Sequence, residues 1–142
     1  MCSRLDTMPE ALEVIRNGGF VVVMDDEGRE NEGDLVMAAQ FANPTLLAFL
    51  VRHTNGILCC PMTEARADEL NLPRMVSKNE DPNQTNFTVS ADLLGEGVTT
   101  GASSDDRAKT AHAFADPGRK AVHFHRPGHL FPLVAKPGGT LG

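Results

Sequence analysis

The chain has 142 residues, a hydrophobic content of 41% and a formal net charge of −6. This length suits one ordinary domain with one core. The sequence has no Trp or Tyr and no basic stripe, which argues against base stacking and against a nucleic-acid partner.

The first half of the chain begins with a helix signal. Thr7 and Glu10 have the spacing of a capping box, and Gly18-Gly19 ends the predicted helix. The apolar run 20–24 follows and predicts a strand that is buried on both faces. We predict a second strand at 35–39 and a helix from Asn43-Pro44 that ends before Asn55-Gly56.

The second half repeats this alternation. We expect a strand at 57–60 ended by Pro61, a helix from Thr63 that stops before Pro73, a strand at 87–91, a helix from 103 through 114, a loop at 124–128 and a strand at 129–135. Helices alternate with strands, so we predict an α/β fold (an α+β sandwich) in which helices flank a mixed sheet. Residues 1–142 are expected to form a single domain without an internal repeat.

Cysteine usage and hydropathy bear on the compartment. Of three cysteines, two are adjacent (Cys59 and Cys60), which is no disulfide framework and fits a reducing environment. The N-terminus has no long apolar run, and no stretch approaches membrane-spanning length. We therefore expect a cytoplasmic protein without a membrane partner.

An acidic loop at residues 25–34 directly follows the first predicted strand. It holds six carboxylates and one arginine, Arg29. Like charges this close repel, and a hard divalent cation such as Mg²⁺ would offset the repulsion. Arg29 is suited to a phosphate or to the negative charge of an enolate. A solvated acidic loop is the alternative interpretation.

Two other known motifs fit this loop poorly. A calcium-binding EF-hand that starts at Asp25 needs glycine and glutamate at its sixth and twelfth positions, which hold Glu30 and Val36. That motif is excluded. A phosphatase that uses Asp25 as its nucleophile is a weak alternative, because Glu27 stands where a second aspartate is needed.

Further candidates lie downstream. His129 follows a rigid Pro-Gly pair and precedes an apolar segment, which suits a proton shuttle, although a structural histidine is the alternative. Residues 97–101 with Ser103 predict either a phosphate or hydroxyl site or a simple turn and helix cap. Cys59 ends a predicted buried strand, so the residues alone place it in the core. The other four histidines have no metal-site spacing.

Residues 25–34 closely resemble the signature of the 3,4-dihydroxy-2-butanone 4-phosphate synthase family, which serves riboflavin biosynthesis. The resemblance continues, in order and spacing, through segments 56–59, 85–88, 97–101, 106–107 and 126–129. It covers nearly the whole chain. Gly28, Ala102 and Ser104 differ mildly from the commoner family residues.

This resemblance implies a lyase that depends on Mg²⁺ (or Mn²⁺) and converts ribulose 5-phosphate to 3,4-dihydroxy-2-butanone 4-phosphate and formate. It implies that Glu30 is a metal ligand, that Arg29 and Asp34 contact the substrate, and that Asp34 helps in proton transfer. It also implies that Cys59 and Thr100 line the site and that His129 is the essential histidine. Family members are homodimers with sites near the dimer interface.

The family pattern continues beyond the glycine-rich end of this sequence. There the resemblance implies a Gly-His-Thr-Glu segment whose histidine is the second metal ligand. We therefore expect a C-terminally incomplete domain that belongs to a longer protein. The alternatives are a chain that a partner completes, or a truncated, non-catalytic member that acts as a binding or interaction module.

Overall fold

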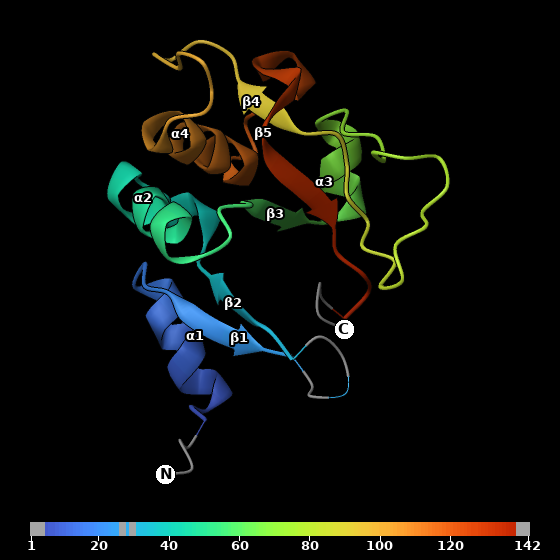
Figure 1. Ribbon diagram of the computed structural model, residues 1–142. Helices are drawn as coiled ribbons and strands as arrows, with labels where there is room; N and C mark the ends of the chain where they lie inside the picture. The colour runs from blue at the N-terminus through green and yellow to red at the C-terminus, as the bar shows by residue number, and fades with distance from the viewer. Residues whose placement is uncertain (1–4, 26–27, 29–30, 139–142) are drawn as a thin grey trace.

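The computed structural model describes residues 5–25, 28 and 31–138 (Figure 1). Its helices are α1 (Met8–Arg16), α2 (Pro44–His53), α3 (Glu64–Glu69) and α4 (Ser104–Ala115), with 3₁₀ turns η1 (Ala39–Phe41) and η2 (Ala121–His123). Its strands are β1 (Val21–Met24), β2 (Gly33–Val36), β3 (Cys59–Met62), β4 (Ala91–Leu93) and β5 (Phe124–Val134). The predicted α/β class is confirmed. Within the described residues, every helix is too short or too polar to cross a membrane.

Helix α1 and the β1–β2 hairpin form the N-terminal part. The capping box is confirmed, because the Thr7 backbone N–H donates to the Glu10 carboxylate at 2.7 Å. Among the described residues, strand β1 pairs with β2 alone, antiparallel, so the prediction of a strand buried on both faces is wrong. Val22 and Met24 are 62% and 53% exposed. Strand β2 begins and ends earlier than the predicted 35–39, because η1 starts at Ala39.

The second sheet has the order β3-β5-β4, in which β3 runs parallel and β4 antiparallel to β5. Pro61 does not end β3 as predicted, because β3 is an edge strand. A proline on an edge strand does not interrupt a hydrogen-bond ladder when its nitrogen faces away from the partner. The predicted strand at 87–91 is displaced to β4, while Phe87 and Thr88 form isolated bridges with Leu133 and Arg74.

Strand β5 corrects another prediction. The expected loop at 124–128 is instead part of one strand that runs from Phe124 to Val134. Along β4, Ala91 pairs with Leu130, whereas the next residue, Asp92, pairs with His125. The intervening residues 126–129 therefore form a bulge without ladder partners on β4, and they read as a loop in the sequence because of Pro127 and Gly128.

The core lies between the second sheet and the helices. Figure 1 shows α2 and α4 packed together beside this sheet, and Ala67 of α3 joins the same core. Phe20, just before β1, stacks on Phe49 of α2 with ring centroids 5.5 Å apart, which attaches the hairpin to the main body. The buried side chains include Leu47, Leu50, Ala108, Ala111, Phe114, Phe124 and Leu130.

Candidate functional site

Cys59 lies at the start of β3, in register with Phe131 of the neighbouring β5. Its side chain is exposed, so the prediction from the residues alone that Cys59 is in the core is wrong. Alternation along the strand explains the error, because the adjacent Cys60 points the other way and packs against the core. Burial raises the pKa of the Cys60 thiol to about 12.

Asp34 of β2 lies close to Cys59, although 25 positions separate them in the sequence. Although Cys59 is exposed, the surrounding protein partly desolvates its thiol and raises the pKa, and the negative charge of Asp34 raises the pKa further. Cys59 therefore remains a neutral thiol at neutral pH. Such a thiol can line a site and donate a weak hydrogen bond, but it is a poor nucleophile.

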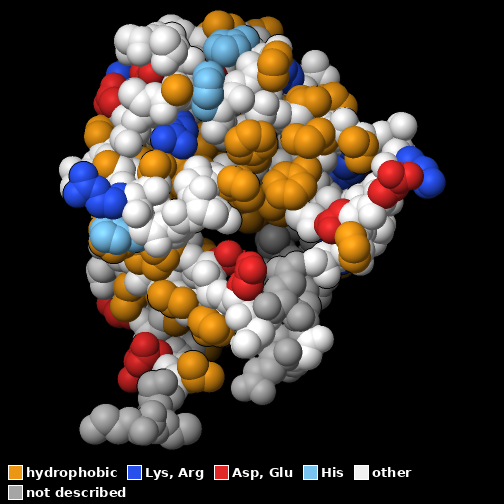
Figure 2. All heavy atoms as spheres, in the orientation of Figure 1, with side chains coloured by type: hydrophobic (Ala, Val, Ile, Leu, Met, Phe, Trp, Pro, Cys, Tyr) orange, Lys and Arg blue, Asp and Glu red, His pale blue; other side chains and the backbone are white. Residues whose placement is uncertain are grey.

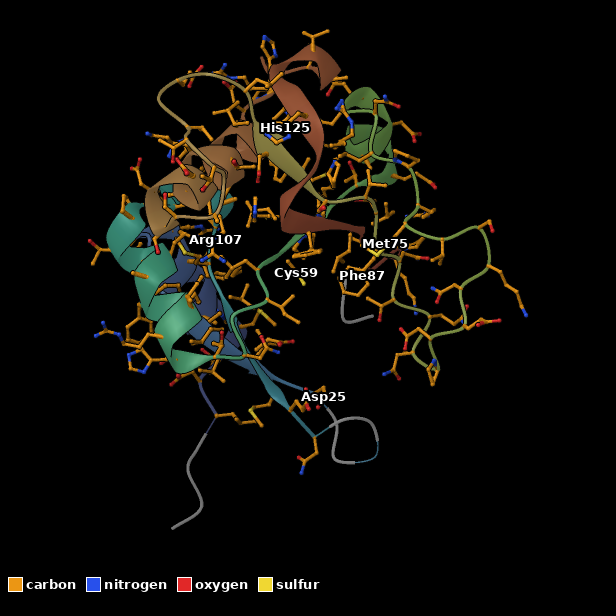
Figure 3. All side chains as sticks on the ribbon, turned by 45° about the horizontal axis from the view of Figure 1, so that its top comes forward. Asp25, Cys59, Met75, Phe87, Arg107 and His125 are labelled. Atoms are coloured by element: carbon orange, nitrogen blue, oxygen red, sulfur yellow. The ribbon has the colours of Figure 1, made fainter. Side chains whose placement is uncertain are left out.

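The acidic loop leaves the hairpin between β1 and β2. The ends of the loop are tied together, because the Asp25 backbone N–H donates to the Glu32 carbonyl at 3.2 Å and the Glu32 N–H donates to the Asp25 carboxylate at 2.8 Å. Arg29 and Glu30, the predicted substrate and metal contacts, lie outside the described residues. Figure 3 shows Asp25 at the end of β1, below Cys59 at the start of β3.

Three of the described residues at this end of the hairpin carry carboxylates: Asp25, Glu32 and Asp34. Figure 2 shows acidic side chains at the rim of a hollow between the hairpin and the rest of the molecule. This donor chemistry suits Mg²⁺, which prefers oxygen ligands and retains several waters. The described part of the chain contains no cluster of three metal-ligating side chains, so a site there needs Glu30 or further ligands.

His129 lies in the β5 bulge, and its side chain is 47% exposed. Its ring Nδ1 is 2.6 Å from Oδ2 of Asp92, and its backbone N–H donates to Oδ1 of the same carboxylate at 2.8 Å. His129 lies two residues before Phe131, which pairs with Cys59 of the neighbouring β3.

Asp92 is not apparent as a site residue from the sequence. Its side chain is fully buried in β4, between Ala91 and Leu93. An aspartate inside a short apolar segment is the signal that was available, because a buried carboxylate requires hydrogen-bond partners. Its partner His129 is 37 positions away, so only the fold identifies it.

The loop at 97–101 is held by Asp106 of α4. The Asp106 carboxylate accepts from the Thr99 N–H at 3.0 Å, from the Thr99 hydroxyl at 2.8 Å and from the Gly101 N–H at 3.1 Å. The Thr99 N–H, more than any other donor, lowers the pKa of Asp106 to about 2. Ser103 caps α4 by accepting from the Asp106 N–H, which is one of the two alternatives that the sequence left open for this segment.

This anchored loop carries Thr100, which is exposed, and Gly101, which packs against the Asp92–His129 pair. A side chain at Gly101 would overlap the Asp92 carboxylate and would approach His129 Nδ1 to 2.8 Å, and the φ of Gly101 is +86°. The fold thus brings together two predicted features, the small-residue loop and the histidine.

Two arginines near the site differ in their contacts. Arg126 is structural, because its guanidinium donates to the carbonyls of Asn71, Ala121 and Phe124 at 2.9 to 3.0 Å. The buried Nε of Arg107 has no hydrogen-bond partner among the described residues. Figure 3 shows Arg107 in the first turn of α4.

The comparisons with known proteins agree with one another. A family model described as 3,4-dihydroxy-2-butanone 4-phosphate synthase matches residues 9–142. The enzyme of that name from Pyricularia oryzae is 46% identical over 138 residues, which are 97% of this chain and 59% of the relative. The riboflavin biosynthesis protein RibBA of Cytophaga hutchinsonii is 48% identical over 97% of this chain and 34% of its own.

A solved structure supports the same family. A crystal structure of 3,4-dihydroxy-2-butanone 4-phosphate synthase in complex with two magnesium ions matches with a TM-score of 0.93 at 46% identity, over 95% of this chain and 62% of that one. This chain therefore spans between about a third and three-fifths of the length of these relatives.

Proposed function

This chain belongs to the 3,4-dihydroxy-2-butanone 4-phosphate synthase family, and we propose that the protein containing it converts D-ribulose 5-phosphate to 3,4-dihydroxy-2-butanone 4-phosphate and formate in riboflavin biosynthesis. The observation that carries the proposal is the exposure of three residues that the resemblance assigns to the site. Asp34, Cys59 and His129 come from three different strands, and each presents its side chain outside the core.

The first chemical step is removal of a proton next to the ketone of the sugar phosphate. A positioned base with a pKa near neutrality performs such a step efficiently. His129 is the base in this proposal, because its exposed ring can present Nε2 to the substrate while Nδ1 faces Asp92. Asp34 accepts and returns a hydroxyl proton of the substrate, and the neutral thiol of Cys59 lines the space beside it.

A divalent cation is proposed as the cofactor, Mg²⁺ or Mn²⁺. Glu30 would hold it beside the carboxylates of the acidic loop, and Arg29 would bind the substrate. When bound, the cation stabilises the negative charge that develops on the substrate oxygens. The relative that crystallised with two magnesium ions supports this choice of metal. Thr100, exposed on the anchored loop, is proposed to contact the substrate.

We also propose that the protein is a cytoplasmic homodimer. Free Cys59 and Cys60 fit a reducing compartment. Ile57, Met75 and Val76 are 58%, 45% and 53% exposed, and Figure 2 shows hydrophobic side chains gathered above the hollow. Exposed apolar surface of this kind is typical of interaction sites. Light scattering after size-exclusion chromatography should give twice the protomer mass.

The test of the function is formate release from ribulose 5-phosphate by the full-length protein that contains this chain. His129→Ala should lower kcat by about 10²–10⁴-fold, the range for loss of a catalytic base. Glu30→Ala removes the residue that would hold the cation and should lower kcat as well. His125→Ala is the matched control, because His125 is exposed on the same strand and its Nδ1 lies 3.1 Å from the Pro127 carbonyl oxygen. Wild-type rates in the Glu30 and His129 variants would contradict the site assignment.

A further inference from the structure

The β5 bulge is built around a single buried carboxylate. Residues 126–129 have no ladder partners on β4, so the backbone N–H groups of the bulge need other acceptors. The Ser90 hydroxyl accepts from the Gly128 N–H at 3.0 Å, and Asp92 Oδ1 accepts from the His129 N–H at 2.8 Å. The side chains on either side of Ala91 thus hold the bulge in place.

Asp92 does more than hold the backbone. Its second oxygen, Oδ2, lies 2.6 Å from His129 Nδ1. The Asp92 side chain has no exposed surface, whereas the His129 ring is 47% exposed. One carboxylate therefore fixes both the backbone and the ring of the same histidine, from inside the protein, and leaves the far side of the ring open.

Two glycines allow this arrangement. A side chain at Gly128 would overlap the backbone of Ala91, and one at Gly101 would overlap the Asp92 carboxylate itself. The Gly101 backbone therefore lies directly against the Asp92 carboxylate, and the Gly128 backbone lies against the Ala91–Asp92 peptide, which leaves little room for water at Oδ2. Charge-assisted hydrogen bonds are stronger where water is excluded.

We propose that Asp92 is the positioning residue for His129: its carboxylate holds the proton on Nδ1, so that Nε2 is the free nitrogen that takes the substrate proton. An ionised carboxylate can only accept, so Nδ1 must donate to Oδ2. A neutral imidazole carries one N–H, and with the proton on Nδ1 the lone pair is on Nε2. A carboxylate that orients a catalytic imidazole is an established device in other enzymes.

The outcome of Asp92→Asn can be predicted, because Oδ1 of Asp92 already accepts the hydrogen bond from the His129 backbone N–H. The amide oxygen must remain near the His129 backbone N–H, which needs an acceptor. The amide nitrogen then faces Nδ1 and donates to it. Nδ1 becomes the acceptor and the proton moves to Nε2, which removes the base without removing the histidine. This inference rests on the proposed function, since positioning matters only if His129 moves a proton.

The experiment has two measurements. In the ¹⁵N-histidine-labelled full-length protein, long-range ¹H–¹⁵N correlation spectra, assigned with a His129→Ala sample, report the tautomer of neutral His129. In the full-length protein, formate release from ribulose 5-phosphate reports the rate. We expect the Nδ1–H tautomer in the wild type, the Nε2–H tautomer in Asp92→Asn, and a loss of kcat of about 10²-fold or more in that variant, with KM changed little.

Ser90→Ala is the matched control. It removes the other side-chain acceptor of the bulge and leaves the Asp92–His129 contact in place. It should keep the Nδ1–H tautomer and a rate within a few-fold of the wild type. A role for Asp92 in folding alone would leave the His129 tautomer unchanged in a folded Asp92→Asn variant.

Three results would overturn the proposal: an Nε2–H tautomer in the wild type, a folded Asp92→Asn variant with the wild-type tautomer, or one with the wild-type rate. If Asp92→Asn does not fold, the tautomer of His129 in the wild type still supports or overturns the proposal. A wild-type protein that releases no formate would contradict the proposed function instead, and the tautomer would still support or overturn the pairing.

Discussion

The β1–β2 hairpin and the β4–β5 bulge supply the two halves of the proposed site, and they are built in opposite ways. The hairpin pairs with no other strand of the described chain, exposes Val22 and Met24, and presents carboxylates that are neighbours in the sequence. The bulge is held from the β4 side by Ser90 and Asp92, and its histidine depends on a carboxylate from a different strand. Local sequence therefore determines the charge of the hairpin half, whereas tertiary packing determines the chemistry of the bulge half.

The largest expected difference between the two halves is the loss of stability when alanine replaces a glycine of the bulge or a glycine of the hairpin. Gly128→Ala places a methyl group against the Ala91 backbone, which cannot move aside, and should reduce the free energy of unfolding by about 3 kcal/mol or more. Gly33→Ala meets the sulfur of Met24 at 2.7 Å, but that side chain is 53% exposed and free to rotate. Its cost should be below about 1 kcal/mol. Urea denaturation measures the free energy of unfolding of both variants. Equal losses would show that the bulge is no more tightly packed at its glycine than the hairpin is.

The next largest effect is expected for Asp106, whose carboxylate holds the loop at 97–101 beside the bulge. Asp106→Asn weakens three hydrogen bonds to Thr99 and Gly101, and should lower Tm by about 5 °C or more near pH 7. Asp105→Asn is the control, because that neighbouring side chain is 53% exposed and pairs only with Lys109. It should change Tm little.

The same anchor predicts a pH dependence. The pKa of Asp106 is about 2 in the folded chain and 3.8 without the fold's interactions. Its contribution to stability is therefore fully present above about pH 4 and is lost as the pH falls toward 2. The Tm difference between the wild type and Asp106→Asn should shrink over that interval. A constant difference down to pH 2 would show that the carboxylate charge is not responsible.

A smaller effect tests the link between hairpin and sheet. Asp34→Asn removes the charge that raises the pKa of the Cys59 thiol, although burial, the larger cause, remains. Iodoacetamide at pH 8 should alkylate Cys59 about two- to fivefold faster in this variant, as site-resolved mass spectrometry would show. Glu32→Gln, another exposed carboxylate of the hairpin, should leave the rate unchanged. An unchanged alkylation rate of Cys59 in Asp34→Asn would show that the Asp34 charge does not act on the Cys59 thiol.

The smallest effect is expected on the exposed face of β1. Val22→Thr should change the free energy of unfolding by less than about 0.5 kcal/mol, because Val22 is 62% exposed and threonine suits a strand equally well. Leu130→Ala in β5, where the leucine is 1% exposed, should cost about 2–5 kcal/mol. A large loss in Val22→Thr would show that this face is covered in solution.

The sequence predicted those features that depend on neighbouring residues. The Thr7–Glu10 capping box, the Asn43 and Ser103 caps and the α/β alternation are all present, because local hydrogen bonds and apolar periodicity determine them. The sequence also identified Asp34 and His129 as candidates. It missed Asp92, because a single aspartate in an apolar segment does not indicate which distant residue it contacts.

The errors had physical causes as well. The run 20–24 is apolar enough for a central strand, yet β1 pairs only with β2 in the described chain. Pro127 and Gly128 indicate a loop by their backbone preferences, and here they form a bulge inside β5. Cys59 seemed buried because its segment is apolar, but alternation placed Cys60 inside instead.

The central claim is that the hairpin half and the bulge half act as one catalytic site. The most direct measurement is kcat for formate release in Asp34→Asn, His129→Ala and the double variant of the full-length protein. Residues that act as a unit are not additive, so the double variant should be no slower than the slower single variant, within about threefold. A double variant whose loss equals the product of the two single losses would show that the two halves act independently and would contradict this account.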